Sequence, residues 1–233
     1  MKHFASFSRL GAVLTLAVAG ASALAIAQHR PPVAPPPAQA AAAGVSIKDI
    51  TNFNKMTAPA PDYGGRANIP SVSRGRARDW GVIDATYTTK SARGAAPWTD
   101  TVTAVFHVML ENTKPEPDEK PFSYFTMTVR YANVPDGDHR AGVVLPPSYL
   151  ERYGGIAAVA VEITAEGAAD PAMKSELNTR NLPADVKNDW WKNDRIMKNP
   201  DPKWDRVVKR DGLIERSKSP FAFINMDDYE VVR

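Results

Sequence analysis

The sequence predicts a mainly β fold, an antiparallel β-sandwich with short helical insertions. Short segments of alternating apolar and polar residues recur between residues 45 and 233, and turn-forming residues separate them. About seven such strands in one domain are typical of a sandwich of immunoglobulin-like type. A parallel α/β fold is disfavoured, because the strands are not followed by regularly repeated amphipathic helices.

The first 27 residues are predicted to be a secretory signal peptide. Lys2 and Arg9 form a positive region, and the apolar run Leu10–Ala27 ends in the small-x-small pattern Ala25-Ile26-Ala27. The alternative is an uncleaved membrane anchor, because the run reaches the lower length limit of a spanning helix. We expect cleavage before Gln28, since the run is rich in small residues.

Residues 28–44 are predicted to be a tether rather than part of the fold. The segment is rich in alanine and contains five prolines (Pro31, Pro32, Pro35, Pro36 and Pro37). Such a sequence favours an extended polyproline helix, which at about 3.1 Å per residue spans about 45 Å. A passive spacer is favoured over a proline-rich ligand for a partner domain. Residues 45–233 are then expected to form a single sandwich domain.

The elements of this domain are expected in a simple order. They are a strand over 45–50, a turn-rich surface loop over 57–76, strands over 79–90, 98–111, 122–132 and 140–145, a short helix over 147–153, a strand over 156–164 and a helical segment over 184–197.

Two of these elements have particularly clear signals. In the strand over 98–111, five successive alternate positions are apolar, which predicts a core face (Val102, Ala104, Phe106, Val108 and Leu110). The short helix begins at Pro147, a residue favoured in the first turn, and Gly154 follows it as the residue that ends the helix.

Composition excludes several classes of chemistry. The chain contains no cysteine, which excludes thiol catalysis, cysteine-based zinc sites, iron–sulfur clusters and disulfides. The formal charge is +3, and removal of the leader with its two cations leaves +1. Such a nearly neutral chain gives no support for binding to nucleic acid.

The motif search predicts no catalytic, cofactor-binding or metal-binding residue. Neither a phosphate-binding glycine loop nor a G-x-S-x-G nucleophile elbow is present. His107 is expected to be an exposed or hydrogen-bonded strand histidine, and Asp136–His139 a plain turn rather than a calcium loop. Asp84, Asp227 and Asp228 are the carboxylates considered for glycoside hydrolysis, but sequence alone does not set their separation. The chain is therefore expected not to be an enzyme.

One tryptophan-rich stretch suggests a candidate interaction surface. Aromatic residues lie beside cations between residues 187 and 210, and the candidate residues are Trp190, Trp191, Trp204, Lys192 and Arg195. Aromatic faces beside cations could stack sugar rings, which makes a carbohydrate-binding module the alternative function. The other interpretation, favoured by the alternating signs of charge, is that a tryptophan covers the core while the charges stay solvated.

Several segments together resemble the verrucomicrobial pilus-like protein family, exported proteins associated with type IV pilus-like assembly genes. The matching segments are Trp80–Tyr87, Trp98–Leu110, Leu150–Gly155, Ala158–Glu162, Trp190-Trp191, Ser219–Ala222 and Asp228–Glu230. The resemblance covers most of residues 78–233 and depends on the segments as a set. It implies an immunoglobulin-like sandwich with a structural or accessory role and no catalytic residue.

The resemblance also implies where the protein works and with what. The expected partners are envelope or pilus-assembly proteins, with glycans as the alternative, and contact with a membrane only through an uncleaved leader. The expected location is the periplasm, the outer surface or the medium of a Gram-negative-type bacterium. The leader ends in Ala-x-Ala before a proline-rich segment, unlike that of true pilins. We therefore expect an accessory or surface-displayed subunit rather than the helical core of a fibre.

Overall fold

A computed structural model describes residues 44–61, 78–91, 94–179, 189–194, 206–222 and 230–231. All of them belong to one unit of the chain, Gln39–Arg233. The predicted leader and nearly all of the predicted tether lie outside the described residues. No helix in the described ranges is long and apolar enough to cross a membrane.

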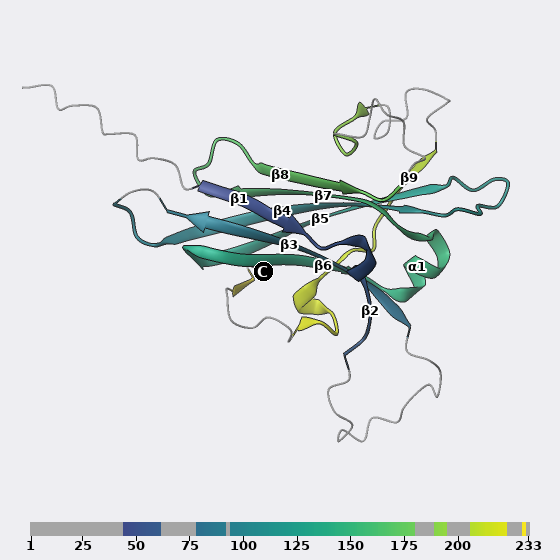
Figure 1. Cartoon of the computed structure of the whole chain (residues 1–233), viewed down its shortest axis with the longest axis horizontal. Helices are drawn as coiled ribbons and strands as arrows, with labels where there is room; N and C mark the ends of the chain where they lie inside the picture. The colour runs from purple at the N-terminus through teal and green to yellow at the C-terminus, as the bar shows by residue number, and fades with distance from the viewer. Residues whose placement is uncertain are drawn as a thin grey trace, which may run out of the picture. The chain divides into compact units, whose positions relative to one another are not determined.

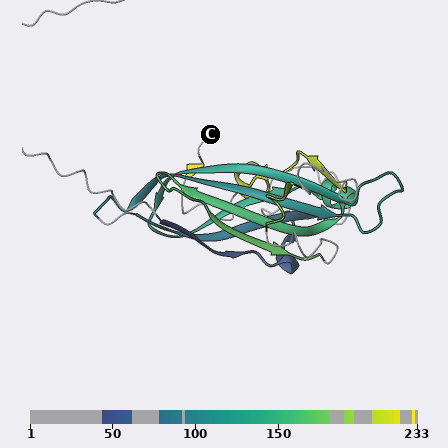
Figure 2. The same ribbon diagram turned by 90° about the horizontal axis from the view of Figure 1, so that it is seen from above.

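The described strands form two sheets, which confirms the predicted mainly β sandwich (Figures 1 and 2). Sheet A has the order β1-β3-β6-β10, and β2 also pairs with β3. Its strands are β1 (Gly44–Ile50), β2 (Thr57–Pro59), β3 (Asp79–Lys90), β6 (Gly137–Leu145) and β10 (Ile214–Glu215).

Sheet B has the order β11-β5-β4-β7-β8, and β9 also pairs with β5. Its strands are β4 (Trp98–Glu111), β5 (Phe122–Pro135), β7 (Gly155–Ala165), β8 (Ala172–Leu177), β9 (Val207–Arg210) and β11 (Glu230–Val231). All described pairings are antiparallel except that of β9 with β5, which is parallel. Sheet B is therefore mixed, whereas the sequence predicted antiparallel strands throughout.

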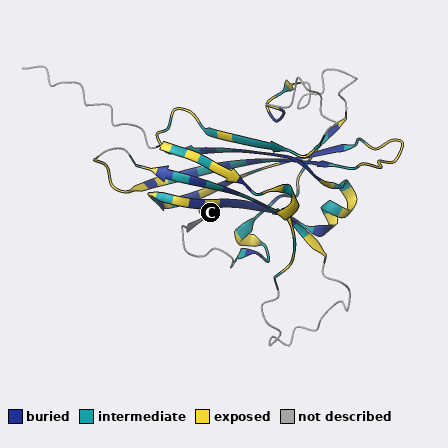
Figure 3. Ribbon diagram, in the orientation of Figure 1, coloured by how far each residue is buried: buried dark blue, intermediate teal, exposed yellow. Residues whose placement is uncertain are grey.

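The core lies between the sheets, where the alternation of β4 predicted it. All five predicted core residues of β4 are completely buried. They pack in one cluster with inward-facing residues of sheet A, among them Ile83, Ala85 and Tyr87 of β3, and with Val159, Val161 and Ile163 of β7. Figure 3 shows this burial along the central strands of both sheets.

The short helix α1 (Pro147–Tyr153) confirms the prediction in both position and length. Gly154 ends it with φ = 90°, in the region that favours glycine. A Cβ at this position would collide with the backbone carbonyl of Glu111. The glycine is therefore required both by its conformation and by the close approach of β4.

Other elements differ from the expectations. The predicted loop over 57–76 begins with β2, which pairs with Asp79–Gly81 of β3. Strands β8 and β9 were not expected, and neither were the short 3-10 helices η1 (Phe53–Lys55) and η4 (Arg216–Lys218). Of the helical segment predicted over 184–197, only residues 189–194 are described, and they form mainly turns.

Candidate interaction site

The paired tryptophans lie in a second apolar cluster on the outer face of sheet B. Trp190 is 0% exposed and Trp191 is 6% exposed. They pack with apolar residues that three different strands direct outward, and with one residue of β9 (Met109, Phe122, Tyr124, Ala158, Ala160 and Val207). The two indole rings meet edge to face, with centroids 5.9 Å apart. The segment that carries them thus covers an apolar part of a sheet face.

This burial corrects the idea that Trp190 and Trp191 are exposed stacking platforms. Their ring faces are used in packing, so a sugar ring has no free indole face there to stack upon. Of the other candidate residues, Lys192 is described and its side chain is 44% exposed. Trp204 and Arg195 lie outside the described residues. Among the described residues, the candidate surface therefore reduces to Lys192 and the groups around it.

Glu162 of β7 holds the tryptophan segment in place. The Trp191 Nε1–H donates a hydrogen bond of 2.5 Å to Glu162 Oε1, and Lys192 Nζ lies 3.4 Å from the same oxygen. Lys192 Nζ also lies 5.8 Å from the centroid of the Trp191 ring. The Glu162 carboxylate therefore binds the indole N–H of Trp191 and the ammonium group of Lys192, which are consecutive residues.

His107 lies beneath this contact on β4. Its Nδ1 is hydrogen-bonded to the hydroxyl of Tyr124 at 2.6 Å, and its Nε2 is 3.7 Å from Glu162 Oε1. Burial lowers the pKa of His107 to about 4; Glu162 opposes this shift and Lys192 adds to it. The imidazole is neutral at neutral pH, and the expected hydrogen-bonded strand histidine is confirmed.

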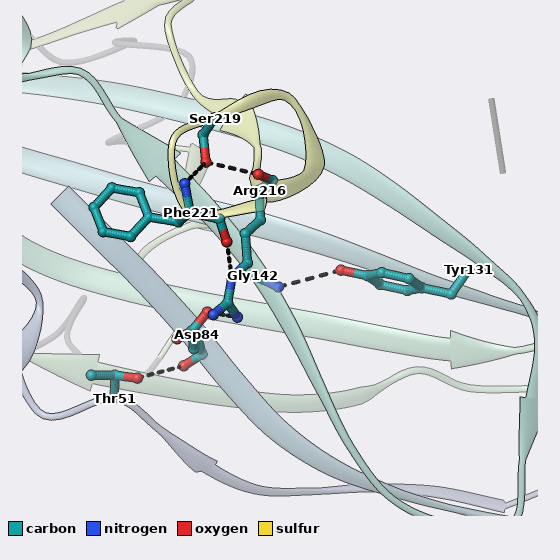
Figure 4. Close-up of polar contacts among 7 residues, drawn as sticks. All are labelled: Thr51, Asp84, Tyr131, Gly142, Arg216, Ser219 and Phe221. Carbon is teal, nitrogen blue, oxygen red and sulfur yellow. Dashed lines mark hydrogen bonds and ion pairs between the residues drawn. The ribbon is translucent and has the colours of Figure 1, made fainter. Parts of the chain in front are cut away.

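A partly buried ion pair forms a second polar centre, on the outer face of sheet A (Figure 4). Arg216 Nη1 lies 3.1 Å from Asp84 Oδ1, and both side chains are 13% exposed. Burial raises the pKa of Asp84, although Arg216 and Arg140 attract its charge. A Cβ on Gly142 would collide with the Asp84 carboxylate, so glycine leaves the space in which this carboxylate lies.

The ion pair fixes the segment that follows β10. Arg216 Nε–H donates to the carbonyl of Phe221 at 3.4 Å, and Ser219 Oγ donates to the carbonyl of Arg216 at 2.7 Å. Phe221 is buried and meets the ring of Trp80 edge to face. Asp84 thus anchors a chain segment, and Asp227 and Asp228, the other carboxylates considered, lie outside the described residues.

The carboxylates of the β5–β6 turn are also occupied by neighbouring groups. Asp136 accepts hydrogen bonds from the backbone N–H and the hydroxyl of Ser91, both at 2.7 Å. Asp138 accepts from Lys48 and Thr88, and the Lys48 hydrogen bond is the main cause of its lowered pKa. No group of three or more potential metal ligands occurs in the part of the chain that the structure describes. The plain turn predicted over 136–139 is shorter than expected: Asp136 alone lies between the strands, and Gly137–His139 begin β6 and pair with β3.

The two sheets end side by side at β1 and β8, which lie against each other (Figure 1). Lys48 is the extra residue of a bulge in β1, and Lys174 Nζ of β8 donates to the Lys48 carbonyl at 2.8 Å. Bulges and lysines protect edge strands against unspecific pairing. Next to this protected edge, Met173 of β8 is 50% exposed, and Lys192 Nζ lies 2.7 Å from its sulfur.

Sequence reasoning missed the contacts that organise these sites. Asp84 and Arg216 are 132 positions apart in the sequence. The local sign of this contact was Asp84 itself, a charged residue in the middle of β3, where its neighbours are apolar residues and threonines. Glu162 likewise interrupts the apolar run of β7. A carboxylate in the middle of a largely buried strand could therefore have indicated both the Asp84–Arg216 pair and the contacts of Glu162.

Comparison with known proteins identifies the family. A family model whose description ends in "-like" matches residues 36–233. No curated protein matches the chain, whereas three chains of solved structures do. One is a protein of Akkermansia muciniphila: 18% of residues are identical, the TM-score is 0.59, and the match covers 82% of this chain and 93% of that one. That similarity supports the fold, and since the family model spans most of the sequence, the chain belongs to this "-like" family.

Proposed function

We propose that this chain is a pilus-like, extracellular protein of the bacterial envelope that acts through protein–protein contacts rather than catalysis. The family match agrees with such a class. The structural match comes from Akkermansia muciniphila, a verrucomicrobial bacterium, and the sequence segments resemble a verrucomicrobial pilus-like family. The proposed partners are envelope or pilus-assembly proteins, reached after export directed by residues 1–27.

The observation that carries the proposal is a pair of neighbouring exposed side chains at β8, Met173 and Lys192. Within the described residues, β8 is hydrogen-bonded to β7 on one side, and its other side lies against β1. The proposed contact is therefore made by side chains and not by addition of a strand. Met173 supplies an apolar contact and Lys192 a cationic one, and we call the two residues with β8 the β8 surface.

The β8 surface is held rigid by the core beneath it. Met173 is opposite Glu162 in the register of β7 and β8, and Glu162 binds both Trp191 and Lys192. The tryptophan pair therefore positions Lys192 beside β8. A surface that needs no reordering loses less conformational entropy when a partner binds.

Affinity enrichment from envelope extracts tests the proposal. The purified chain, Met173→Glu and Thr128→Glu are immobilised, and captured proteins are identified by mass spectrometry. Thr128 is a matched control because it is also exposed, on β5 of the same sheet. We expect enrichment of pilus-assembly or surface proteins by the natural chain and the Thr128 variant, and its loss with Met173→Glu. Absence of such proteins from all three captures would overturn the proposal.

A further inference from the structure

A hollow lies on the outer face of sheet B, where β4 and β7 pair. Its volume is about 290 Å³, and it is lined by Thr101, Thr103, Thr164, Ala165 and Glu166. Thr101 and Thr103 alternate with core residues of β4 and therefore point outward. Thr103 is opposite Thr164 in the register of β4 and β7, so the two side chains share this face. The hollow thus gathers three hydroxyl groups and one carboxylate, in a space suited to a small polar ligand.

Trp98 shares this face with the hollow. Thr99 is buried and lies opposite Val134, a residue of the core between the sheets, so Trp98, the residue before Thr99, points outward. Thr101 points outward as well, which means that the alternation of β4 is interrupted between them. Asn133, beside this interruption on β5, has φ = 55° and is the only non-glycine residue with a positive φ in the described ranges. At about 3.4 Å per residue, Trp98 and Thr101 are about 10 Å apart.

Both parts of this surface are held by backbone hydrogen bonds. The Pro97 carbonyl, directly before Trp98, accepts from the Asp136 N–H at 3.0 Å, and the Thr101 carbonyl accepts from the Glu166 N–H at 2.8 Å. Trp98 is nevertheless 53% exposed, in contrast to the buried tryptophan pair. An exposed indole on a fixed backbone loses little conformational entropy when a ligand binds.

The chemistry of these groups suits a neutral sugar chain. The apolar face of a sugar ring packs on an exposed indole, and hydroxyl and carboxylate groups exchange hydrogen bonds with sugar hydroxyls. Arg130 is exposed on β5 opposite Thr103, and its charge balances that of Glu166, so a ligand without net charge matches the surface. The separation of about 10 Å between Trp98 and Thr101 is longer than one sugar ring, which favours an oligosaccharide over a free monosaccharide.

We propose that the outer face of sheet B binds a neutral oligosaccharide between Trp98 and the threonine-lined hollow. One sugar ring packs on the Trp98 indole, and another enters the hollow and exchanges hydrogen bonds with Thr103, Thr164 and Glu166. This site is distinct from the tryptophan stretch that the sequence suggested for carbohydrate, where the indole faces are buried. The proposal goes beyond the proposed function, since it requires no protein partner and does not use the β8 surface.

Binding to defined glycans tests this proposal. An array of neutral and acidic oligosaccharides is probed with the purified chain, and the neutral oligosaccharide that binds best is titrated by calorimetry, alongside its constituent monosaccharide. We expect the oligosaccharide to bind more tightly than the monosaccharide. Trp98→Ala removes the packing surface and is expected to weaken binding at least about tenfold. Thr103→Val combined with Thr164→Val removes two hydroxyls at nearly constant shape and is expected to weaken it about tenfold.

Thr128→Val is the matched control, because Thr128 is an exposed threonine of β5 outside the lining of the hollow. Its affinity for the oligosaccharide is expected to equal that of the natural chain, and unchanged thermal unfolding of every variant confirms that the fold is kept. Failure to bind any neutral oligosaccharide, binding to acidic oligosaccharides alone, or full affinity in Trp98→Ala would overturn the proposal. These results leave the protein contacts of the β8 surface unaffected, so the two proposals fail independently.

Discussion

Replacing Arg216 with alanine is predicted to lower the free energy of unfolding by about 3 kcal/mol, more than is expected for an exposed ion pair. The change leaves the Asp84 carboxylate in place without its nearest counterion. It also removes the hydrogen bond from Arg216 to the Phe221 carbonyl, which helps to close the segment over sheet A.

The magnitude follows from distance and burial. Two unit charges 3.1 Å apart attract by about 5 kcal/mol at an effective dielectric constant of about 20. The desolvation that raises the pKa of Asp84 offsets much of this attraction. Removing one partner from a buried pair typically costs about 3–5 kcal/mol. We expect the lower value, because both side chains keep 13% exposure and Arg140 still attracts the Asp84 charge.

Urea unfolding at neutral pH measures the effect against two comparison variants. Lys48→Ala removes an ion pair of 2.6 Å whose side chains are 51% and 60% exposed, so little stability is expected to be lost. Asp84→Asn removes the buried charge itself while keeping a polar group for Arg216. Its expected loss is therefore smaller than that of Arg216→Ala.

The pH dependence separates the charge from simple packing. A carboxyl whose pKa is raised in the folded state contributes stability below its unfolded pKa, and that contribution is lost as the pH rises through the folded pKa. Arg216→Ala raises the pKa of Asp84 further, so its destabilisation should shrink as acid neutralises Asp84. A loss no larger than that of Lys48→Ala, or one that is equal at all pH values, would refute this reasoning.

Three further predictions concern the core and its turns. His107 has a lowered pKa, so its contribution to stability is present above pH 6.5 and declines as the pH falls towards about 4. In His107→Gln, the loss of unfolding free energy between pH 6.5 and about 4 should be smaller by up to about 3 kcal/mol, measured by urea unfolding at several pH values. Trp190→Ala should cost about 3–5 kcal/mol in thermal or urea unfolding, because it empties a fully buried site; a loss below about 1 kcal/mol would contradict that packing. Gly154→Ala should cost at least about 2 kcal/mol, whereas Gly155→Ala, which meets open space, should change little; equal effects of the two would contradict the assigned backbone conformation.

The fold was largely predictable where burial depends on local periodicity. Five apolar residues occupy alternate positions of β4, so all of them point to the same face of the sheet, and that face must be turned towards the core to exclude water. The observed core contains all five. The helix over 147–153 was bounded by Pro147 and Gly154, whose backbone preferences are intrinsic. Strand β8, with the sequence Ala-Met-Lys-Ser-Glu-Leu, has no such pattern, because it lies at a sheet edge and pairs on one side.

The sites depended on contacts between distant residues, which one sequence does not reveal. The tryptophan stretch was recognised, but its burial required knowing that Met109, Phe122 and Ala158 of three strands form one apolar area on the outer face of sheet B. Trp191 and Glu162 are 29 positions apart, and Asp84 and Arg216 are 132 apart. No periodic pattern connects such pairs, so both the buried tryptophans and the ion pair emerged only from the folded chain.

Site-specific photo-crosslinking in the producing bacterium tests the proposed function most directly. A photoreactive amino acid replaces Met173 on the β8 surface, and Thr128 is replaced in the control. We predict that the Met173 probe forms covalent products with envelope or pilus-assembly proteins, identified by mass spectrometry, and that the Thr128 probe does not. Products confined to cytosolic proteins, or no protein product from position 173 in intact cells, would contradict a role in extracellular protein–protein contact.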